Sequence, residues 1–423
     1  MKKNSKLIWV GLLFGMVGLI AWLYQSLFGL ASTGMRNSFP WGLYIACFEF
    51  YVGAAAGAML VCSLACLSGK KSFEPVAKIA SFISLACTVA AGIAIFMDLG
   101  SAQTMMRLLL SPNLGSPLLW DILVLAVFLV VAVIMVLSMI RPQREAKPAL
   151  IMFALVMSAV LGLVTALLFA TQKAQPLWNT LLFPLDALLV GYALGAALVI
   201  LFAIGLSKKD RVAEQTSSFG FLAKIIAFCL IGHLGLTAID ALPLLLGSSV
   251  ENQIQAEILF GRYGGLFVLE VLLLAAAAAM FLSKRFNQYY KPLLLSGVLV
   301  VLGVFVNKIL MLMAAFNAIP LSLEVDGAGL WSMPVSTGVF ASGTDSFVTF
   351  WGYLPTLTEL GVSLLPLSAA LLIIAGLNNY LLKKGSEAGS EMESEGKPRQ
   401  DLDNKVVYRI PRLIRIPPNR DNP

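Results

Sequence analysis

Apolar residues run along this chain in long blocks that short polar segments separate. Ten blocks are long enough to cross a bilayer as helices, because the hydrocarbon core takes about 20 residues of helix. This pattern predicts an all-α integral membrane protein with about ten transmembrane helices. The predicted helices cover residues 7–30, 41–68, 75–99, 117–140, 149–171, 183–207, 219–246, 256–283, 290–316 and 346–382.

The composition changes abruptly near residue 383, where Glu, Ser, Lys, Arg and Pro replace the apolar residues. A segment of this kind cannot bury enough apolar area to fold by itself. We therefore expect a polytopic membrane domain of ten helices over 1–382 and a disordered, basic cytoplasmic tail over 383–423. In the tail, VYRIPRLIRIPPNR interleaves arginines with aliphatic residues, which suits anionic lipid, a partner groove or plain solvated disorder.

The overall composition agrees with a bilayer environment, and the charge gives the orientation. Of the 423 residues, 59% are apolar and 13% are charged, and the formal net charge is +7. If successive loops alternate between the two sides, 25 of the 30 Lys and Arg residues fall on one side, which the positive-inside rule makes cytoplasmic. Both termini are then cytoplasmic, and the positive charge gives no support to nucleic-acid binding. The longer loops lie on the opposite, outer side.

Histidine and cysteine usage limits the cofactors that this chain can hold. His233 is the one histidine in the sequence, whereas a bis-histidine haem needs two imidazoles and a zinc or di-iron site usually needs more than one. The five cysteines lie inside apolar runs without a Cys-x-x-Cys pair, so we interpret them as small buried hydrophobic residues. We expect no haem, iron–sulfur cluster or metal in this chain.

The most specific stretch is NSFPWGLYIACFEFYVGAAAGAM at 37–59, where a carboxylate lies inside an apolar helix. The four-residue stride of a helix puts Trp41, Glu49 and Gly53 on roughly one face, and Gly57 continues the row. Glycines there let a neighbouring backbone come close. Glu49 lies on the order of 12 Å below Trp41, where a charge is costly and suggests function. The alternative is a protonated acid that bonds to a neighbouring helix.

Ionisable residues inside the predicted helices lie in the outer halves, and the inner halves hold essentially none. Deep burial favours a functional or paired role, whereas an acid at a helix end, such as Asp186, can be merely interfacial. Proton chemistry in this chain would therefore use the outer aqueous face. From the outer ends towards the midplane, the helical rise gives the order Asp98, Asp121, Asp186 and Asp240, then Glu49 and Lys308, then His233, Glu270 and Glu359.

Four stretches spread over the membrane domain carry a resemblance to a known family. They are NSFPWGLYIACFEFYVGAAAGA at 37–58, MDLGSAQTMMRLLLSPNLGSPLLWD at 97–121, QPLWNTLLFPLDALLVGYALG at 175–195 and YLPTLTELG at 353–361. As a set they resemble the NrfD/PsrC family of polysulfide-reductase-type membrane subunits, in the ten-helix branch of hydrogenase and sulfur-metabolism complexes. The resemblance implies two four-helix bundles plus peripheral helices, in a bacterial or archaeal cytoplasmic membrane.

The same resemblance implies a function and its partners. A haem-free subunit of this kind exchanges electrons and protons between a quinone, of the menaquinone type, and a ferredoxin-like iron–sulfur subunit on the outer face. A multihaem cytochrome or a molybdopterin catalytic subunit completes such complexes. Asn37 and Asp98 match the family's Asn and acid, while Trp41 stands where a His is expected. The candidates are Asn37, Asp98 and His233 for headgroup contact or proton exchange, and Glu49, Asp121, Glu270, Lys308 and Glu359 for a proton path or buried pairs; none is assigned as catalytic.

Two other classes of function remain open at this point. A secondary transporter would show broken helices that meet at the midplane and a polar path to both sides, and the nearly apolar inner halves count against it. A passive anchor would use its buried acids only to bridge helices. The Gly- and Ser-rich segment 317–345 is a docking loop, a lid or a plain connector.

Overall fold

The computed structural model describes most of the membrane-embedded part of the chain. Among the described residues, ten segments are long and apolar enough to cross a membrane, and the protein is therefore a multi-pass membrane protein. The described residues are 5–35, 39–140, 146–173, 175–206, 216–284, 286–316, 320–325, 329–334 and 353–394.

The helices follow the predicted apolar blocks closely. The spanning helices are α1 (Ser5–Phe28), α2 (Leu43–Leu67), α3 (Glu74–Asp98), α5 (Pro117–Ile140), α6 (Pro148–Ala170), α7 (Phe183–Leu206), α9 (Thr216–Leu246), α11 (Gly264–Leu282), α12 (Tyr290–Phe316) and the pair α13 (Leu357–Val362) and α14 (Leu364–Ser394). The short elements are α4 (Ala102–Leu110), α10 (Val250–Ala256), a π-helical turn (Glu257–Arg262), 3₁₀ turns (Gly29–Ser32, Lys71–Phe73, Phe286–Gln288) and the strands β1 (Pro320–Val325) and β2 (Gly329–Pro334).

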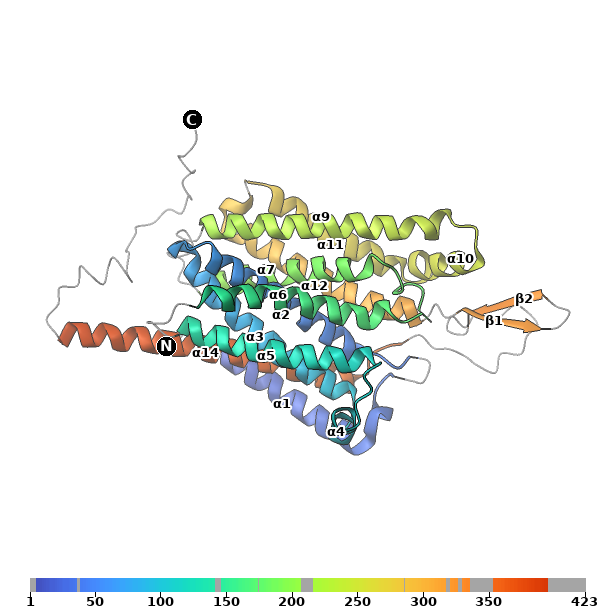
Figure 1. Ribbon diagram of the computed structural model, residues 1–423, viewed down its shortest axis with the longest axis horizontal. Helices are drawn as coiled ribbons and strands as arrows, with labels where there is room; N and C mark the ends of the chain where they lie inside the picture. The colour runs from blue at the N-terminus through green and yellow to red at the C-terminus, as the bar shows by residue number, and fades with distance from the viewer. Residues whose placement is uncertain are drawn as a thin grey trace.

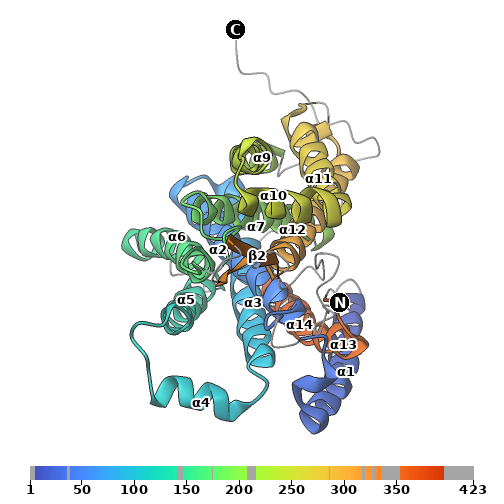
Figure 2. The same ribbon diagram turned by 90° about the vertical axis from the view of Figure 1, so that its right-hand side faces the viewer.

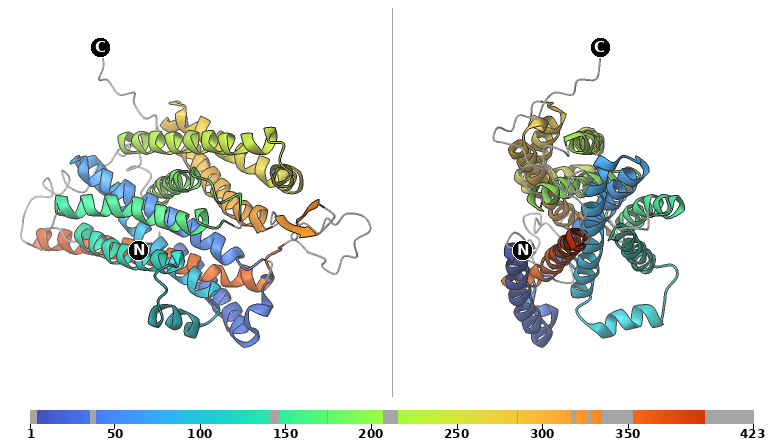
Figure 3. Two further views of the ribbon diagram at one scale, coloured as in Figure 1. Left: turned by 45° about the vertical axis from the view of Figure 1, so that its right-hand side comes forward. Right: turned by 90° about the vertical axis from the view of Figure 1, so that its left-hand side faces the viewer.

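Two four-helix bundles lie side by side, and a peripheral pair packs against one of them (Figure 2). The first bundle contains α2, α3, α5 and α6, and the second contains α7, α9, α11 and α12. Helices α1 and α14 run along each other beside α3 (Figure 3). The architecture that the resemblance implied, two bundles plus peripheral helices, is confirmed.

The two bundles meet along a seam of glycines on α2 and α7. A Cβ atom added to Gly57 would lie 2.3 Å from the carbonyl oxygen of Gly191, and one added to Gly195 would lie 2.3 Å from the amide nitrogen of Ala58. Gly53 also approaches Gly191, with 3.0 Å from its ideal Cβ position to the Gly191 Cα. Small residues at four-residue spacing therefore let the two backbones touch, as predicted for α2.

One end of the molecule carries α4, α10 and the hairpin, and we call it the loop end (Figure 1). Helix α1 begins and α14 ends at the opposite end (Figure 1). The loop end corresponds to the predicted outer face, and the side of the membrane on which it lies stays a prediction. The antiparallel hairpin, in which Leu323 pairs with Trp331, projects beyond the helices and had no signal in the apolar pattern.

The tenth span differs from its prediction at both ends. Residues 353–356 are not helical and α13 begins at Leu357, because Pro355 disfavours a helical residue before it and Thr356 and Glu359 close a capping box. The helix is interrupted at Ser363, and α14 continues past residue 382 to Ser394. Residues 395–423 lie outside the described residues, so the domain boundary and the disordered tail stay predictions.

The new start of the tenth span corrects the depth of Glu359. The sequence pattern placed it near the midplane because the apolar block was counted from residue 346. In the structure Glu359 lies in the first turn of α13, at the loop end. The midplane prediction for this residue is therefore wrong.

Candidate functional site

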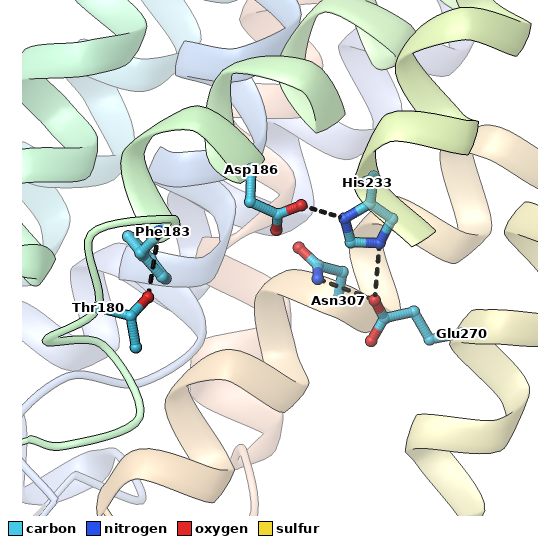
Figure 4. A network of polar contacts seen from close by, with 6 residues as sticks. All are labelled: Thr180, Phe183, Asp186, His233, Glu270 and Asn307. Carbon is cyan, nitrogen blue, oxygen red and sulfur yellow. Dashed lines mark hydrogen bonds and ion pairs between the residues drawn. The ribbon is translucent and has the colours of Figure 1, made fainter. Parts of the chain in front are cut away.

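Four polar side chains from four helices of the second bundle form one connected array (Figure 4). Nδ1 of His233 on α9 lies 2.7 Å from Oδ1 of Asp186 on α7, and its Nε2 lies 3.3 Å from Oε1 of Glu270 on α11. The amide of Asn307 on α12 donates to the same Glu270 oxygen over 2.9 Å. We call these four residues the acid–imidazole array.

The geometry of the array requires a shared proton. A neutral imidazole donates from one nitrogen only, so the carboxyl group at the other nitrogen must then be the donor. An imidazolium instead donates to both carboxylates. His233 is 1% exposed and Glu270 3% exposed, which places this proton away from bulk water. A proton can therefore move between His233 and a carboxyl group of the array without breaking these contacts.

A cavity of about 380 Å³ opens beside the array at the loop end of the second bundle. Asp186, Glu270 and Asn307 line it, together with Asp240 and the aromatic side chains of Trp178 and Phe267. His233 lies behind the two carboxylates and is not part of the lining. A ligand in the cavity would touch the carboxylates, which would pass a proton to or from the imidazole.

A buried ion pair lies immediately beside the array, on the first-bundle side of α12. Nζ of Lys308 is 3.2 Å from Oε2 of Glu49, and both side chains are 4% exposed. Oε1 of Glu49 has no hydrogen-bond partner among the described residues. The neighbouring residues Asn307 and Lys308 thus reach into different bundles. Glu49 therefore lies in an ion pair with a Lys of another helix, and its role in proton chemistry or in structure stays a prediction.

Asp121 forms a separate contact inside the first bundle. The hydroxyl of Thr165 on α6 donates to Oδ1 of Asp121 on α5 over 2.5 Å, and the Asp121 side chain is fully buried. Its second oxygen has no partner within the described part of the chain. Asp121 is therefore a buried carboxyl group with one free oxygen, held between two helices.

Glu359 connects the start of α13 to the segment that leads into α2. Its Oε1 accepts from the Tyr353 hydroxyl over 2.6 Å, and its Oε2 accepts from the amides of Gly34 over 2.7 Å and Thr356 over 3.0 Å. The Tyr353 oxygen in turn accepts from the amide of Leu43 over 2.6 Å. Burial raises the pKa of Tyr353 and the bond to Glu359 raises it further, so the phenol stays a donor. These contacts form a clasp, which we name the Glu359 clasp.

Asp98 is not brought to the array. Asp98 is the last residue of α3, in the first bundle next to α14, whereas His233 belongs to the second bundle. Oδ1 of Asp98 is buried without a partner in the described residues. Asn37 lies outside the described residues. The structure therefore joins His233 to Glu270, and Glu49 to Lys308, but among the described residues it keeps Asp98 apart from His233.

Aromatic rings fill the loop end around the start of α2, where Trp41 lies just before that helix and Phe316 ends α12 of the second bundle. The Trp41 ring lies 5.8 Å from Trp178 in a stacked arrangement, 5.4 Å from Phe169 and 6.0 Å from Phe316, centroid to centroid. The Trp178 indole donates to the carbonyl of Met311 over 3.0 Å. We call these four rings the aromatic cluster.

Two members of the array were not among the predicted site residues. Asp186 was interpreted as interfacial, and Asn307 was not among the candidates. The depth count separated Asp186 from His233, because α9 runs on to Leu246 and its residues count from a more distant end. The available signal was one polar residue inside each of the four apolar helices.

The chain matches the family model described as "Polysulphide reductase, NrfD" over residues 31–320. The chain belongs to the NrfD family. Among curated proteins, a putative membrane subunit of a dimethyl sulfoxide reductase from Halobacterium salinarum is 26% identical over 89% of this chain and 92% of its own length. NrfD membership makes the chain a membrane subunit of the type found in quinone-linked oxidoreductase complexes.

Two further similarities cover smaller parts of the chain. An Hdr-like menaquinol oxidoreductase integral membrane subunit of Archaeoglobus fulgidus is 23% identical over 40% of this chain and 42% of its own length. A selenate reductase subunit of Mesobacillus selenatarsenatis is 23% identical over 30% of each chain. Each of these relatives is one subunit of a reductase or an oxidoreductase. The similarity therefore indicates that this chain also has partner subunits in a complex of that kind.

Proposed function

We propose that this NrfD protein exchanges electrons and protons between a quinone of the menaquinone type and an extracytoplasmic iron–sulfur subunit. The observation that carries the proposal is the acid–imidazole array beside a cavity at the loop end. Family membership and the naming of one relative as a menaquinol oxidoreductase subunit support it. A multihaem or molybdopterin catalytic subunit would complete the complex on the same side.

The chemistry of a quinone explains why such an array is needed. Oxidation of a quinol releases two electrons and two protons, and reduction of a quinone takes up the same number. The electrons pass between the ring and the partner's iron–sulfur centre. With His233 as an imidazolium between two carboxylates, the array can accept one proton from a quinol on Glu270, and the protonated array can return that proton to a quinone. Charge therefore does not accumulate on the ring during transfer.

The other buried groups have different roles in this proposal. Further ionisable groups lie on the first-bundle side of the array, namely Glu49, Lys308 and Asp121. They serve as a proton path or as fixed pairs. The Glu359 clasp holds the start of α2 in place, so Glu359 acts through structure. Asp98 remains a candidate for proton exchange next to the peripheral pair.

The alternatives make different predictions for the same helices. A secondary transporter needs helices broken near the midplane. In the described spans the tenth is interrupted at Ser363, one turn after its start at the loop end. A passive anchor needs no proton-exchanging array, and its complex would neither bind nor turn over quinone.

The test is quinone-linked turnover of the intact complex, purified from native membrane with its partners identified by mass. His233→Gln and Glu270→Gln are each expected to lower turnover by about 100-fold or more, because positioned acid–base groups contribute that much. Glu74→Gln, which removes an exposed carboxylate at the opposite end, is the control and is expected to leave turnover unchanged. Full turnover in both array variants, or a complex without quinone and without an iron–sulfur subunit, would overturn the proposal.

A further inference from the structure

We propose that the cavity of the second bundle is a water-filled vestibule, through which the acid–imidazole array exchanges protons with the aqueous phase at the loop end. Asp240 is the carboxylate at the mouth of this route. The inference rests on the proposed function and adds the path of the proton. It does not depend on where the quinone binds.

The lining of the cavity is too polar for a dry space. Eight of its 19 lining residues have hydroxyl, amide or carboxyl side chains, and three of these are Asp186, Asp240 and Glu270. Empty cavities in proteins are apolar, whereas a buried carboxyl group is costly unless it is hydrogen-bonded or hydrated. At about 30 Å³ for each water molecule, the volume of about 380 Å³ holds on the order of ten waters.

Helix α9 separates the cavity from the lipid. Thr237 and Asp240 line the cavity and lie four and seven residues after His233, so the three share one side of the helix. The opposite side is apolar, and its Ile231 and Leu242 are 50% and 52% exposed. Since α9 crosses the membrane, this apolar side faces the hydrocarbon. The polar residues of α9 therefore face water inside the protein and not the bilayer.

The cavity extends beyond the membrane spans at the loop end. Asn252 and Gln255 of α10 line it, and so does Thr180 of the segment before α7. Helix α10 lies outside the candidate spans and at the loop end (Figure 1). Asp240 is half-buried and lies seven residues, or about 10 Å of helix, beyond His233 towards that end. Asp240 therefore lies between the array and the outer water.

The carboxyl groups of the array become drier away from the loop end (Figure 4). The side chain of Asp186 is 21% exposed, whereas that of Glu270 is 3% exposed. Within the described part of the chain no Lys or Arg lines the cavity, so its carboxyl groups favour hydronium there. A proton on Glu270 can pass directly to cavity water, which carries it past Asp186 to Asp240.

The first test is the reaction of introduced cysteines with a charged methanethiosulfonate, on the intact complex in lipid vesicles. Only thiolates react, and thiolates form in water. We expect Thr237→Cys and Ala241→Cys to react about tenfold faster than Ala238→Cys, or more. Ala238 is the matched control, because it is exposed on the same helix at the same depth but does not line the cavity. Wild type gives the background of the five native cysteines.

The outcomes separate this inference from the proposed function. Equal reaction rates at the three positions would overturn the vestibule and leave the proposed function standing, because quinone does not enter the measurement. Fast reaction at the two cavity positions in a complex without quinone-linked turnover would contradict the proposed function alone.

The second test assigns the role of Asp240. Asp240→Asn is expected to lower quinone-linked turnover on the order of tenfold, less than the array variants, because water can replace part of the route. Formate, a small weak acid, should restore most of this loss by carrying protons through the hydrated cavity, whereas a structural loss would not respond. Glu257→Gln removes an exposed carboxylate at the loop end outside the cavity, and it should match wild type. Unchanged turnover in Asp240→Asn, or a loss that formate does not restore, would exclude Asp240 from the route.

Discussion

The loop ends of the two bundles differ in how completely side chains fill them and in whether their polar groups are titratable. Around the start of α2, the aromatic cluster and the Glu359 clasp leave each ring against another ring and the Glu359 oxygens with donors. In the second bundle an array of two acids and one imidazole lies next to open volume. Filled volume with satisfied polar groups favours stability, whereas a titratable array beside a cavity favours exchange with a ligand. The comparison therefore assigns a structural role to one end and a chemical role to the other.

The largest expected effect comes from separating the two bundles. Gly195→Ala puts a methyl group 2.3 Å from backbone atoms of α2. Because backbone atoms cannot rotate away as a side chain can, α2 and α7 would have to move apart and lose their close contact. Because overpacking costs about 1–3 kcal/mol even when side chains can move, we expect loss of folded protein in membranes. Gly205→Ala on the same helix meets nothing within 4 Å and is the control. Equal yields of the two variants by size-exclusion chromatography would show that the seam does not hold the bundles together.

The next effect concerns the ion pair that lies between the two ends. Lys308→Met leaves Glu49 buried without its partner, which is expected to cost about 3–5 kcal/mol and to lower the midpoint of thermal unfolding in detergent. The double variant Glu49→Leu, Lys308→Met removes both charges and should recover most of the loss. Lys78→Met breaks the exposed pair with Glu74 and should stay within about 1 kcal/mol. A double variant as unstable as the single one would mean that packing of Lys308, not charge, is what matters.

A smaller effect is expected from the clasp. Tyr353→Phe leaves the Leu43 amide and one Glu359 oxygen without partners, at a cost of about 1–3 kcal/mol. If the first-bundle end is structural, the unfolding midpoint falls while the turnover of assembled complex stays within about twofold. A large loss of turnover at unchanged stability would contradict the division of roles between the two ends.

The smallest effect should come from Trp41. Trp41→Phe keeps an aromatic ring in the aromatic cluster and loses part of its contact area, so we expect a loss below about 1.5 kcal/mol. Quinone-linked turnover should not change, because Trp41 is not part of the acid–imidazole array. Turnover of the purified complex checks this expectation, and a large loss at unchanged stability would give Trp41 a chemical role.

Much of the architecture could be predicted because membrane helices carry their own signal. A run of apolar residues long enough to span has few alternatives in lipid, so the helix ends follow from the sequence. Glu49 and the glycines of α2 were recognised for the same reason, since a charge or a repeated small residue stands out in an apolar run.

The contacts between helices were harder to predict, because depth counts assume that all helices end at one level. His233 and Asp186 were placed at different depths although they are in contact, since α9 is 31 residues long and α7 is 24. Glu359 was misplaced because residues 353–356 are not helical and α13 begins at Leu357. The hairpin depends on pairing between β1 and β2, which an apolar count does not report.

The pairing of Glu49 with Lys308 has a consequence for how the protein is made. The two residues are 259 positions apart in sequence, so at about 5–20 residues per second the ribosome delivers Lys308 roughly 10–50 s after Glu49. Throughout that interval α2 must enter the membrane without its counter-charge. Glu49 is therefore inserted as the neutral acid, or it waits at the translocon until α12 arrives.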